Sequence, residues 1–283
     1  MLSYVINLDR DKDRLAHMTA EANRIGLALE RFTALDGCHL SADLRGQFYG
    51  DDGRLHEPAM TPGEVGCYAS HLSVLKLVAG GKSEAALIFE DDVQMLDGLA
   101  PSIAAAMAVA PGWDIIRLSN ATKSVALSVA PLGGGRELVK YWTVPNSAGA
   151  YLISRAGAEK FLRAYERRTL PIDEDLRRPW RSGMNTYGIL PPPVVPDVCM
   201  VSSICSMGRP RRVPARSRFK DAAPARDFLA SWSYRLKTFG PWAFCQALVR
   251  EPLAVAAARI VGREASRRIC VMPPSVGRGD GQG

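Results

Sequence analysis

The 283-residue chain lacks any uncharged stretch long enough to cross a bilayer. A membrane-spanning helix needs about 18–20 consecutive apolar residues, and none is present. Residues 1–8 also lack the basic region and the cleavage site of a signal peptide, and Asp9 follows them directly. We therefore expect residues 2–8 to form a first buried strand.

Cysteine and histidine are scarce. The six cysteines show no C-x-x-C spacing and are spread along the whole chain, so the sequence indicates neither a zinc site nor a disulfide framework. This pattern fits a reducing cytoplasm. The four histidines are too few for the His/Asp ligand pairs expected of a metal-dependent phosphohydrolase, which makes that class of enzyme the weaker alternative.

The charge is unevenly distributed. Residues 208–283 contain fifteen Lys/Arg and five Asp/Glu, a net charge of +10, whereas residues 1–207 contain 21 basic and 24 acidic residues. Basic residues alternate with aromatic ones, including Trp232 and Trp242, which is typical of a helix at an anionic membrane surface. No recognition motif for nucleic acid accompanies the charge. The alternative is an ordinary C-terminal helix that packs on the body of the protein.

Hydrophobic periodicity predicts alternating strands and helices over the first 170 residues. This order favours an α/β fold with a mixed, largely parallel sheet flanked by helices. Thr61, Pro62 and Glu64 predict a helix start, because they combine a capping box with proline at the first helical position. We expect one domain over residues 1–207 and a basic, partly helical extension over residues 208–283, with residues 273–283 disordered.

The most informative motif is Glu90-Asp91-Asp92, directly after the apolar residues 85–89. Three adjacent carboxylates repel one another unless a cation compensates them. Carboxylate oxygens suit Mg²⁺ or Mn²⁺, which proteins commonly bind through one or two carboxylates plus substrate phosphates. Strand alternation would direct Glu90 and Asp92 to one side and Asp91 to the other.

Several motifs follow one another in a characteristic order, and together they resemble glycosyltransferase family 25, the lipooligosaccharide galactosyltransferases and their relatives. The resemblance covers about residues 1–205. Its motifs occupy residues 6–10, 31–37, 61–67, 70–71, 88–93, 150–154 and 171–173.

The resemblance implies a GT-A-like fold, a nucleotide-sugar donor, usually UDP-galactose, and a divalent metal, Mn²⁺ or Mg²⁺. It also implies transfer with inversion onto a glycan acceptor such as lipopolysaccharide. The expected location is the cytoplasm, at the inner face of the cytoplasmic membrane. A non-catalytic glycan- or membrane-binding protein that has kept the fold is the alternative.

The candidate site residues fall into three groups. Glu90 and Asp92 are the expected metal ligands, and Glu90 is also a candidate ribose contact. Ligands bind at the carboxyl ends of parallel strands, which makes Asn7 and Arg14 candidates for donor binding. His71, in the Ser-His motif, is assigned to donor binding or to a structural hydrogen bond.

The acidic residues after Pro171 are the candidate catalytic groups. Inversion by single displacement needs a general base for the acceptor hydroxyl, and Asp173 and Asp175 are the candidates. The alternative is that Asp173 caps the following helix and that its acidic neighbours favour the positive end of the helix dipole.

Overall fold

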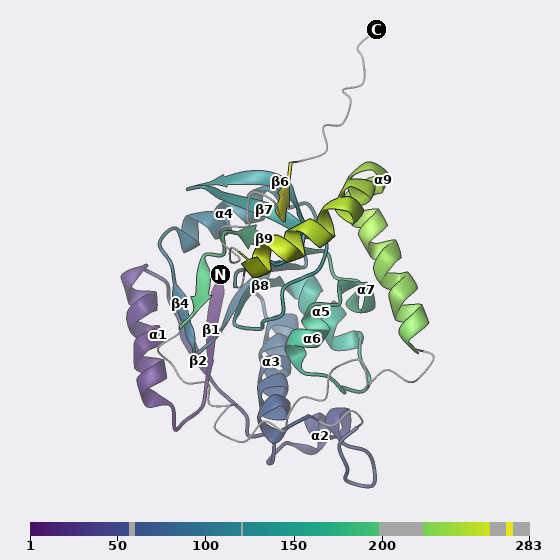
Figure 1. The fold of residues 1–283 in the computed structure, drawn as a ribbon. Coiled ribbons are helices and arrows are strands. Elements are labelled where there is room, and N and C mark those ends of the chain that lie inside the picture. Colours follow the sequence, from purple (N-terminus) through teal and green to yellow (C-terminus); the bar gives the residue numbers. More distant parts are fainter. Residues whose placement is uncertain (57–59, 120, 198–222, 261–269, 274–283) are drawn as a thin grey trace.

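The structure is a computed structural model that describes residues 1–56, 60–119, 121–197, 223–260 and 270–273 (Figure 1). The predicted domain boundary near residue 207 and nearly all of the segment predicted to be disordered lie outside the described residues. No helix within the described ranges combines the length and the apolar character that a membrane crossing requires.

A nine-stranded sheet forms the centre of the molecule, in the order β11-β6-β7-β9-β5-β8-β3-β1-β2. Seven strands point in one direction and two, β7 and β8, run opposite to them, which confirms the prediction of a mixed, largely parallel sheet. The strands are β1 (Leu2–Asn7), β2 (Glu30–Thr33), β3 (Ala85–Glu90), β5 (Ile115–Arg117), β6 (Ala126–Gly133), β7 (Arg136–Tyr141), β8 (Ala150–Ser154), β9 (Thr186–Leu190) and β11 (Val271–Met272). A small second sheet pairs β4 (Val93–Met95) with β10 (Val194–Pro196).

Helices cover both faces of the sheet (Figure 1). Alternation along β3 sends Ile88 to one face and Leu87 to the other, where they join separate hydrophobic clusters. The first face carries α2 (Ala42–Phe48), α3 (Pro62–Gly80), α5 (Arg155–Arg163) and α6 (Ile172–Leu176). The second carries α1 (Lys12–Arg24) and α4 (Leu99–Val109), and α7 (Pro179–Ser182) contacts the long C-terminal helix.

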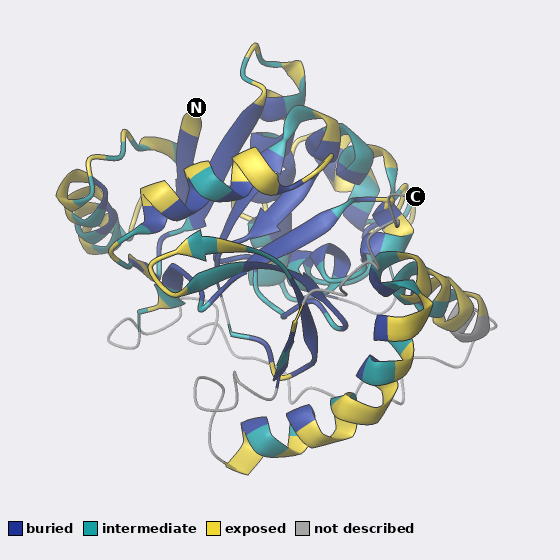
Figure 2. Ribbon diagram, turned by 90° about the horizontal axis from the view of Figure 1, so that it is seen from above, coloured by how far each residue is buried: buried dark blue, intermediate teal, exposed yellow. Residues whose placement is uncertain are grey.

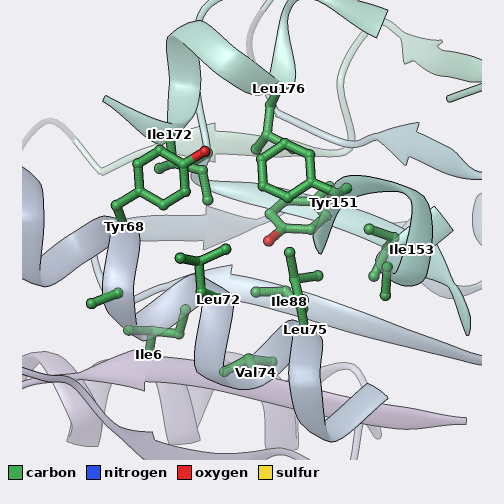
Figure 3. Packing of buried hydrophobic residues seen from close by; sticks show 14 of the residues in the cluster. Ile6, Tyr68, Leu72, Val74, Leu75, Ile88, Tyr151, Ile153, Ile172 and Leu176 are labelled. Carbon is green, nitrogen blue, oxygen red and sulfur yellow. The ribbon is translucent and has the colours of Figure 1, made fainter. Parts of the chain in front are cut away.

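The core of the first face lies between α3 and the sheet. Figure 3 shows Leu72 and Leu75 of α3 facing Ile88 of β3, with Tyr68 and Tyr151 close by. The strands of the sheet are buried from end to end in the centre, as Figure 2 shows. Close packing on both faces fixes the ends of the strands relative to the helices.

Helix α3 begins as the sequence predicts. The Thr61 hydroxyl accepts a hydrogen bond from the Glu64 backbone N–H, and the Glu64 carboxylate accepts one from the Thr61 N–H, with Pro62 at the start. The segment before the helix is held just as closely, because the Leu35 N–H donates to the Ser70 hydroxyl at 2.8 Å. These contacts place residues 34–37 directly beside the first turns of α3.

The C-terminal helix α9 (Ala223–Ile260) packs on the body and consists of two helical segments that meet at Gly240. Phe239, Ala243 and Ala247 contact the cluster around Trp142. The Glu251 carboxylate accepts hydrogen bonds from the Ser124 hydroxyl and the Val125 N–H. The inner face of α9 therefore packs on the body of the protein, as the alternative to membrane binding predicts for the extension.

Glycine is required where residues 34–37 meet α3. A Cβ on Gly66 would lie 2.6 Å from the Leu35 carbonyl oxygen and 2.8 Å from the Gly37 nitrogen, both of them backbone atoms.

We expect Gly66→Ala to lower the free energy of unfolding by about 1–3 kcal/mol, the usual cost of overpacking, although alanine favours helix. Urea unfolding measures the change. Gly80→Ala in the same helix is the control, because its Cβ would meet nothing within 4 Å, and equal effects at the two positions would contradict the steric explanation.

Candidate active site

Three strands deliver polar residues to one edge of the sheet. Asn7, Glu90 and Arg117 are the last residues of β1, β3 and β5, which point in the same direction. This edge, at the carboxyl ends of the strands, is where open α/β sheets bind ligands. The sequence predicted two of these residues, Asn7 and Glu90, and missed Arg117.

The acidic triplet does not follow strand alternation throughout. β3 ends at Glu90, and Asp91 and Asp92 form the turn that follows it. Arg14 reaches both turn residues, with distances of 2.5 Å to Asp91 Oδ1 and 3.4 Å to Asp92 Oδ2. The period of two that underlies the predicted alternation therefore applies only as far as Glu90, because the strand stops there.

Asp91 is held by the residues expected to bind the donor. Its carboxylate accepts hydrogen bonds from Asn7 Nδ2 at 2.7 Å and from Arg14. Burial raises the pKa of Asp91, against the opposing effects of the Asn7 hydrogen bond and the Arg14 charge. Asn7 also accepts from Arg31 Nε and is almost fully buried. This arrangement makes Asn7 a residue that positions Asp91 at the end of the strand.

Glu90 faces α3, on the same side of β3 as Ile88. Its Oε1 lies 3.4 Å from His71 Nε2 and 3.5 Å from Cys67 Sγ. His71 is fully buried, and its Nδ1 lies 2.9 Å from the Tyr151 hydroxyl. Burial raises the pKa of Glu90, but the hydrogen bond and charge of His71 outweigh it and bring the pKa below its ordinary value.

A cavity of about 290 Å³ opens beside the triplet. Four of the five predicted site residues outside the 171–175 region line this cavity: Arg14, His71, Glu90 and Asp92. The opposite wall comes from residues 34–38 and from the start of α3, including Gly66 and Cys67. Arg10, at one side, adds a second positive charge.

The donor set of this cavity suits a hard divalent cation. Asp92 has a side chain that is 35% exposed, which leaves it accessible from the cavity. Burial and then the charge of Glu90 raise the pKa of Asp92 to about 6, so the two carboxylates lie close enough to repel each other. Carboxylate oxygens with spare acceptor capacity are the ligands that Mn²⁺ and Mg²⁺ prefer. Glu90 and Asp92 therefore fit the metal implied by the sequence.

Arg117 is a buried cation behind the acidic strand end. Its side chain is 1% exposed, and none of its three guanidinium nitrogens has a hydrogen-bond partner among the described residues. Burial lowers the pKa of Arg117, and the nearby Tyr141, Tyr151, Asp173 and Glu90 oppose that change. The sequence signal that could have identified Arg117 is a charged residue at the end of the short apolar strand β5.

Asp173 lies near the same group of charges. Burial raises the pKa of the Cys67 thiol most, and the charges of Glu90 and Asp173 raise it further. The charge of Asp173 also opposes the lowering of the Arg117 pKa by burial. α6 begins after Pro171, so Asp173 is in the first turn and is not the cap itself, although its carboxylate accepts a hydrogen bond from the Glu174 N–H. Asp173 and Glu90 therefore act electrostatically on the same two groups, Cys67 and Arg117, although Asp173 is not among the residues that line the cavity.

Asp175 belongs to a different, buried network. Its Oδ2 accepts a hydrogen bond from the Tyr68 hydroxyl at 2.8 Å, and that hydroxyl accepts one from Arg168. Asp175 is 2% exposed. A general base must reach the acceptor hydroxyl, so this placement assigns Asp175 to the support of α6 and α3 rather than to contact with substrate.

The chain belongs to glycosyltransferase family 25. The sequence model of this family, described as glycosyltransferase family 25 (LPS biosynthesis protein), matches residues 1–176. The matched residues include the acidic triplet, helix α3 with Cys67 and His71, and Asp173. Membership confirms the resemblance drawn from the order of the motifs.

Relatives with curated descriptions carry different functional names. A glycosyltransferase 25 family member of Anopheles gambiae is 31% identical over 188 residues, which cover 61% of this chain and 30% of the relative. The inactive glycosyltransferase 25 family member 3 of Mus musculus is also 31% identical, over 61% of this chain and 31% of the relative. Procollagen galactosyltransferase 1 of Danio rerio is 28% identical, over 61% of this chain and 30% of the relative. The aligned part of the chain thus spans about a third of these relatives.

A solved structure with a similar outline is a Drosophila β-1,4-galactosyltransferase 7 mutant in complex with manganese, UDP-Gal and xylobiose. It is 12% identical, covers 78% of this chain and 80% of its own, and superposes with a TM-score of 0.40.

The Asp175 network predicts a specific dependence of stability on pH. Burial raises the pKa of Asp175 to about 6, above the value of about 3.9 in an unfolded chain. The folded state therefore binds the extra proton, and this stabilisation is present at low pH and lost as the pH rises through about 6. We expect Asp175→Asn, which keeps an acceptor for Tyr68, to remove this loss, as measured by urea unfolding between about pH 4 and pH 7.

The matched variant is Asp175→Ala. It leaves the Tyr68 hydroxyl without its acceptor, which should cost about 1–3 kcal/mol at every pH. Parallel stability curves for the wild type and Asp175→Asn would show that Asp175 does not titrate in this way.

Proposed function

We propose that this protein is a metal-dependent glycosyltransferase that moves a hexose from a nucleotide-sugar donor to a glycan acceptor with inversion. The observation that carries the proposal is the cavity beside Glu90 and Asp92, which combines an acidic wall with the cations Arg10 and Arg14. Galactose from UDP-galactose is the preferred donor, because a relative is named procollagen galactosyltransferase. The family description favours lipopolysaccharide as the acceptor.

Glu90 and Asp92 would hold Mn²⁺ or Mg²⁺. When bound, such an ion neutralises the charge that develops on the leaving diphosphate. The chain supports this arrangement through Arg14, which balances Asp91 and Asp92, and through His71, which holds Glu90 ionised and in a fixed orientation. Arg10, at the edge of the cavity, is free of a salt bridge among the described residues and is placed to meet a phosphate.

Asp173 is the proposed general base. Its charge acts on Arg117 together with that of Glu90, and a carboxylate in this region would accept the proton of the acceptor hydroxyl as the new bond forms. Arg117 has no hydrogen-bond partner among the described residues, and its charge helps to lower the pKa of Glu90. Arg117 is therefore a positioning residue.

A non-catalytic function is the alternative, because several relatives are named inactive or probably inactive. The polar residues of this chain support catalysis instead. Repelling carboxylates at Glu90 and Asp92 cost stability, and a protein that only packs or binds through this fold has no physical need for them.

Two variants separate the roles in the proposed reaction. Asp92→Asn should abolish transfer and weaken metal-dependent binding of UDP-sugar, since it removes a metal ligand. Asp173→Asn should reduce turnover by about 100- to 10,000-fold, the usual contribution of acid–base catalysis, with donor affinity nearly unchanged. Calorimetry gives the affinity and a transfer assay gives the turnover.

Asp175→Asn is the matched control for Asp173→Asn, because it neutralises a carboxylate two residues away in a network that is closed to substrate. We expect it to keep most of the turnover. Donor affinity that is equal with and without a chelator would contradict the metal proposal, and normal turnover of Asp173→Asn would exclude that residue as the base.

We also propose that the protein works at an anionic membrane surface and meets it through α9. Of the two tryptophans predicted to insert, Trp232 packs against Trp142 and Phe244, whereas Trp242 is 72% exposed. Val249, at 73%, and Leu253, at 63%, continue an exposed apolar surface along the same helix. Figure 2 shows how much of α9 faces outward. Exposed apolar residues on a basic extension suit anionic lipid.

Point variants test this surface without removing the inner face of α9. We expect Trp242→Ser combined with Val249→Ser to reduce sedimentation with anionic vesicles, and we expect wild-type binding to weaken as salt rises, because surface charges are screened within about 8 Å at physiological salt. Val109→Ser on α4 is the control, since it removes an exposed apolar side chain elsewhere. Unchanged sedimentation of the double variant would show that α9 is not the contact.

A further inference from the structure

Cys67, His71 and Glu90 form a cluster whose composition differs from that of the proposed manganese site. Their ligating atoms, a sulfur, an imidazole nitrogen and a carboxylate oxygen, all lie within 4.8 Å of one another. Cys67 and His71 are one helical turn apart on α3, so both side chains project from the same face of the helix toward Glu90. The helix and the strand thus present three different donors to one point at the cavity wall.

We propose that Cys67, His71 and Glu90 are a binding site for a thiophilic divalent cation, with Zn²⁺ as the representative ion. Thiolate and imidazole ligands favour Zn²⁺ over Mn²⁺ or Mg²⁺, which prefer oxygen. This site is distinct in its ligands from the Glu90 and Asp92 pair, although it shares Glu90 with it. The lack of C-x-x-C spacing hid it in the sequence, because its third ligand comes from a strand 19 residues further along the chain.

Two of the three distances between the donor atoms match tetrahedral zinc, and the third, from sulfur to nitrogen, is within 4.8 Å. Bond lengths of about 2.3 Å to sulfur and about 2.0–2.1 Å to nitrogen and oxygen, at tetrahedral angles, place sulfur and oxygen about 3.5 Å apart and nitrogen and oxygen about 3.3 Å apart. The corresponding distances here are 3.5 Å from Cys67 Sγ to Glu90 Oε1 and 3.4 Å from His71 Nε2 to the same oxygen. Three protein ligands with a fourth position toward the cavity is the usual arrangement of an open zinc site.

The surroundings also orient the histidine for a metal. The Tyr151 hydroxyl lies 2.9 Å from His71 Nδ1, on the side of the ring opposite Nε2. If that hydroxyl accepts the Nδ1 proton, a bound ion can displace the Nε2 proton that otherwise faces Glu90, and the Nε2 lone pair then binds the ion. Hydrogen bonds of this kind fix the tautomer and orientation of metal-binding histidines, and their loss typically costs about 10–100-fold in affinity. Tyr151 is fully buried and stacks on His71, so its position is rigid.

The test is an optical titration of the full-length protein with Co²⁺ in the presence of a non-thiol reductant. We expect a thiolate-to-cobalt charge-transfer band that saturates at one equivalent and disappears when Zn²⁺ is added. Cys67→Ser should abolish the band. Cys38→Ser is the matched control and should retain it, because Cys38 lines the same cavity but lies outside the cluster.

Tyr151→Phe adds a graded readout, since it keeps the ring and removes only the hydroxyl. We expect the apparent affinity for Co²⁺ to fall by about 10–100-fold. Circular dichroism verifies that each variant is folded, and His71→Gln provides a second route to the loss of the band if Cys67→Ser does not fold. Absence of a band in the wild type, or a band that survives both Cys67→Ser and His71→Gln, would overturn the proposal.

The two metal proposals can fail separately. Asp92→Asn leaves all three ligands of the cluster in place, so it should keep the cobalt band even though it removes transfer. Because Glu90 is shared, Zn²⁺ should suppress Mn²⁺-dependent binding of UDP-sugar in the wild type and do so less in Cys67→Ser. This last comparison rests on the proposed function, whereas the cobalt titration does not.

Discussion

Glu90 ends a buried strand directly beneath α3, and the surrounding structure keeps a carboxylate charge at that point. Burial of an unpaired charge is costly, and the cost falls when the charge has hydrogen-bond donors and nearby cations. His71 and Cys67 provide the donors, and Arg117 lies nearby without a hydrogen-bond partner of its own among the described residues. The close approach of α3 to residues 34–37 through Gly66 holds the helix in the position that these contacts require.

The three carboxylates of the triplet have separate environments, although they are adjacent in sequence. Asp91 pairs with Arg14, accepts a hydrogen bond from Asn7 and fixes the turn, whereas Asp92 is accessible from the cavity. Glu90, the last residue of the strand, is held by His71 of α3. One run of like charges therefore yields one structural residue and two candidate ligands, because the strand ends in the middle of the motif.

The C-terminal extension combines two surfaces on one helix. Small and aromatic residues, such as Ala243, Ala247 and Phe239, pack on Trp142 and join α9 to the body. Trp242 and Val249 lie outward, so packing on the body and contact with a membrane are not exclusive alternatives for this helix. The sequence presented them as alternatives because composition does not separate the two faces of a helix that contains a bend at Gly240.

Local signals in the sequence determined the class of fold, the start of α3 at its capping box, the family and the place of the acidic triplet at a strand end. These depend on periodicity, capping and motif order, which neighbouring residues carry by themselves. Tertiary structure decided which polar residues meet. Arg117, Cys67 and Glu90 lie on separate elements, and Asp173 and Asp175, two residues apart, face different networks because α6 presents them in different directions. Contacts between distant elements depend on how the helices pack on the sheet, and that information is not local in the chain.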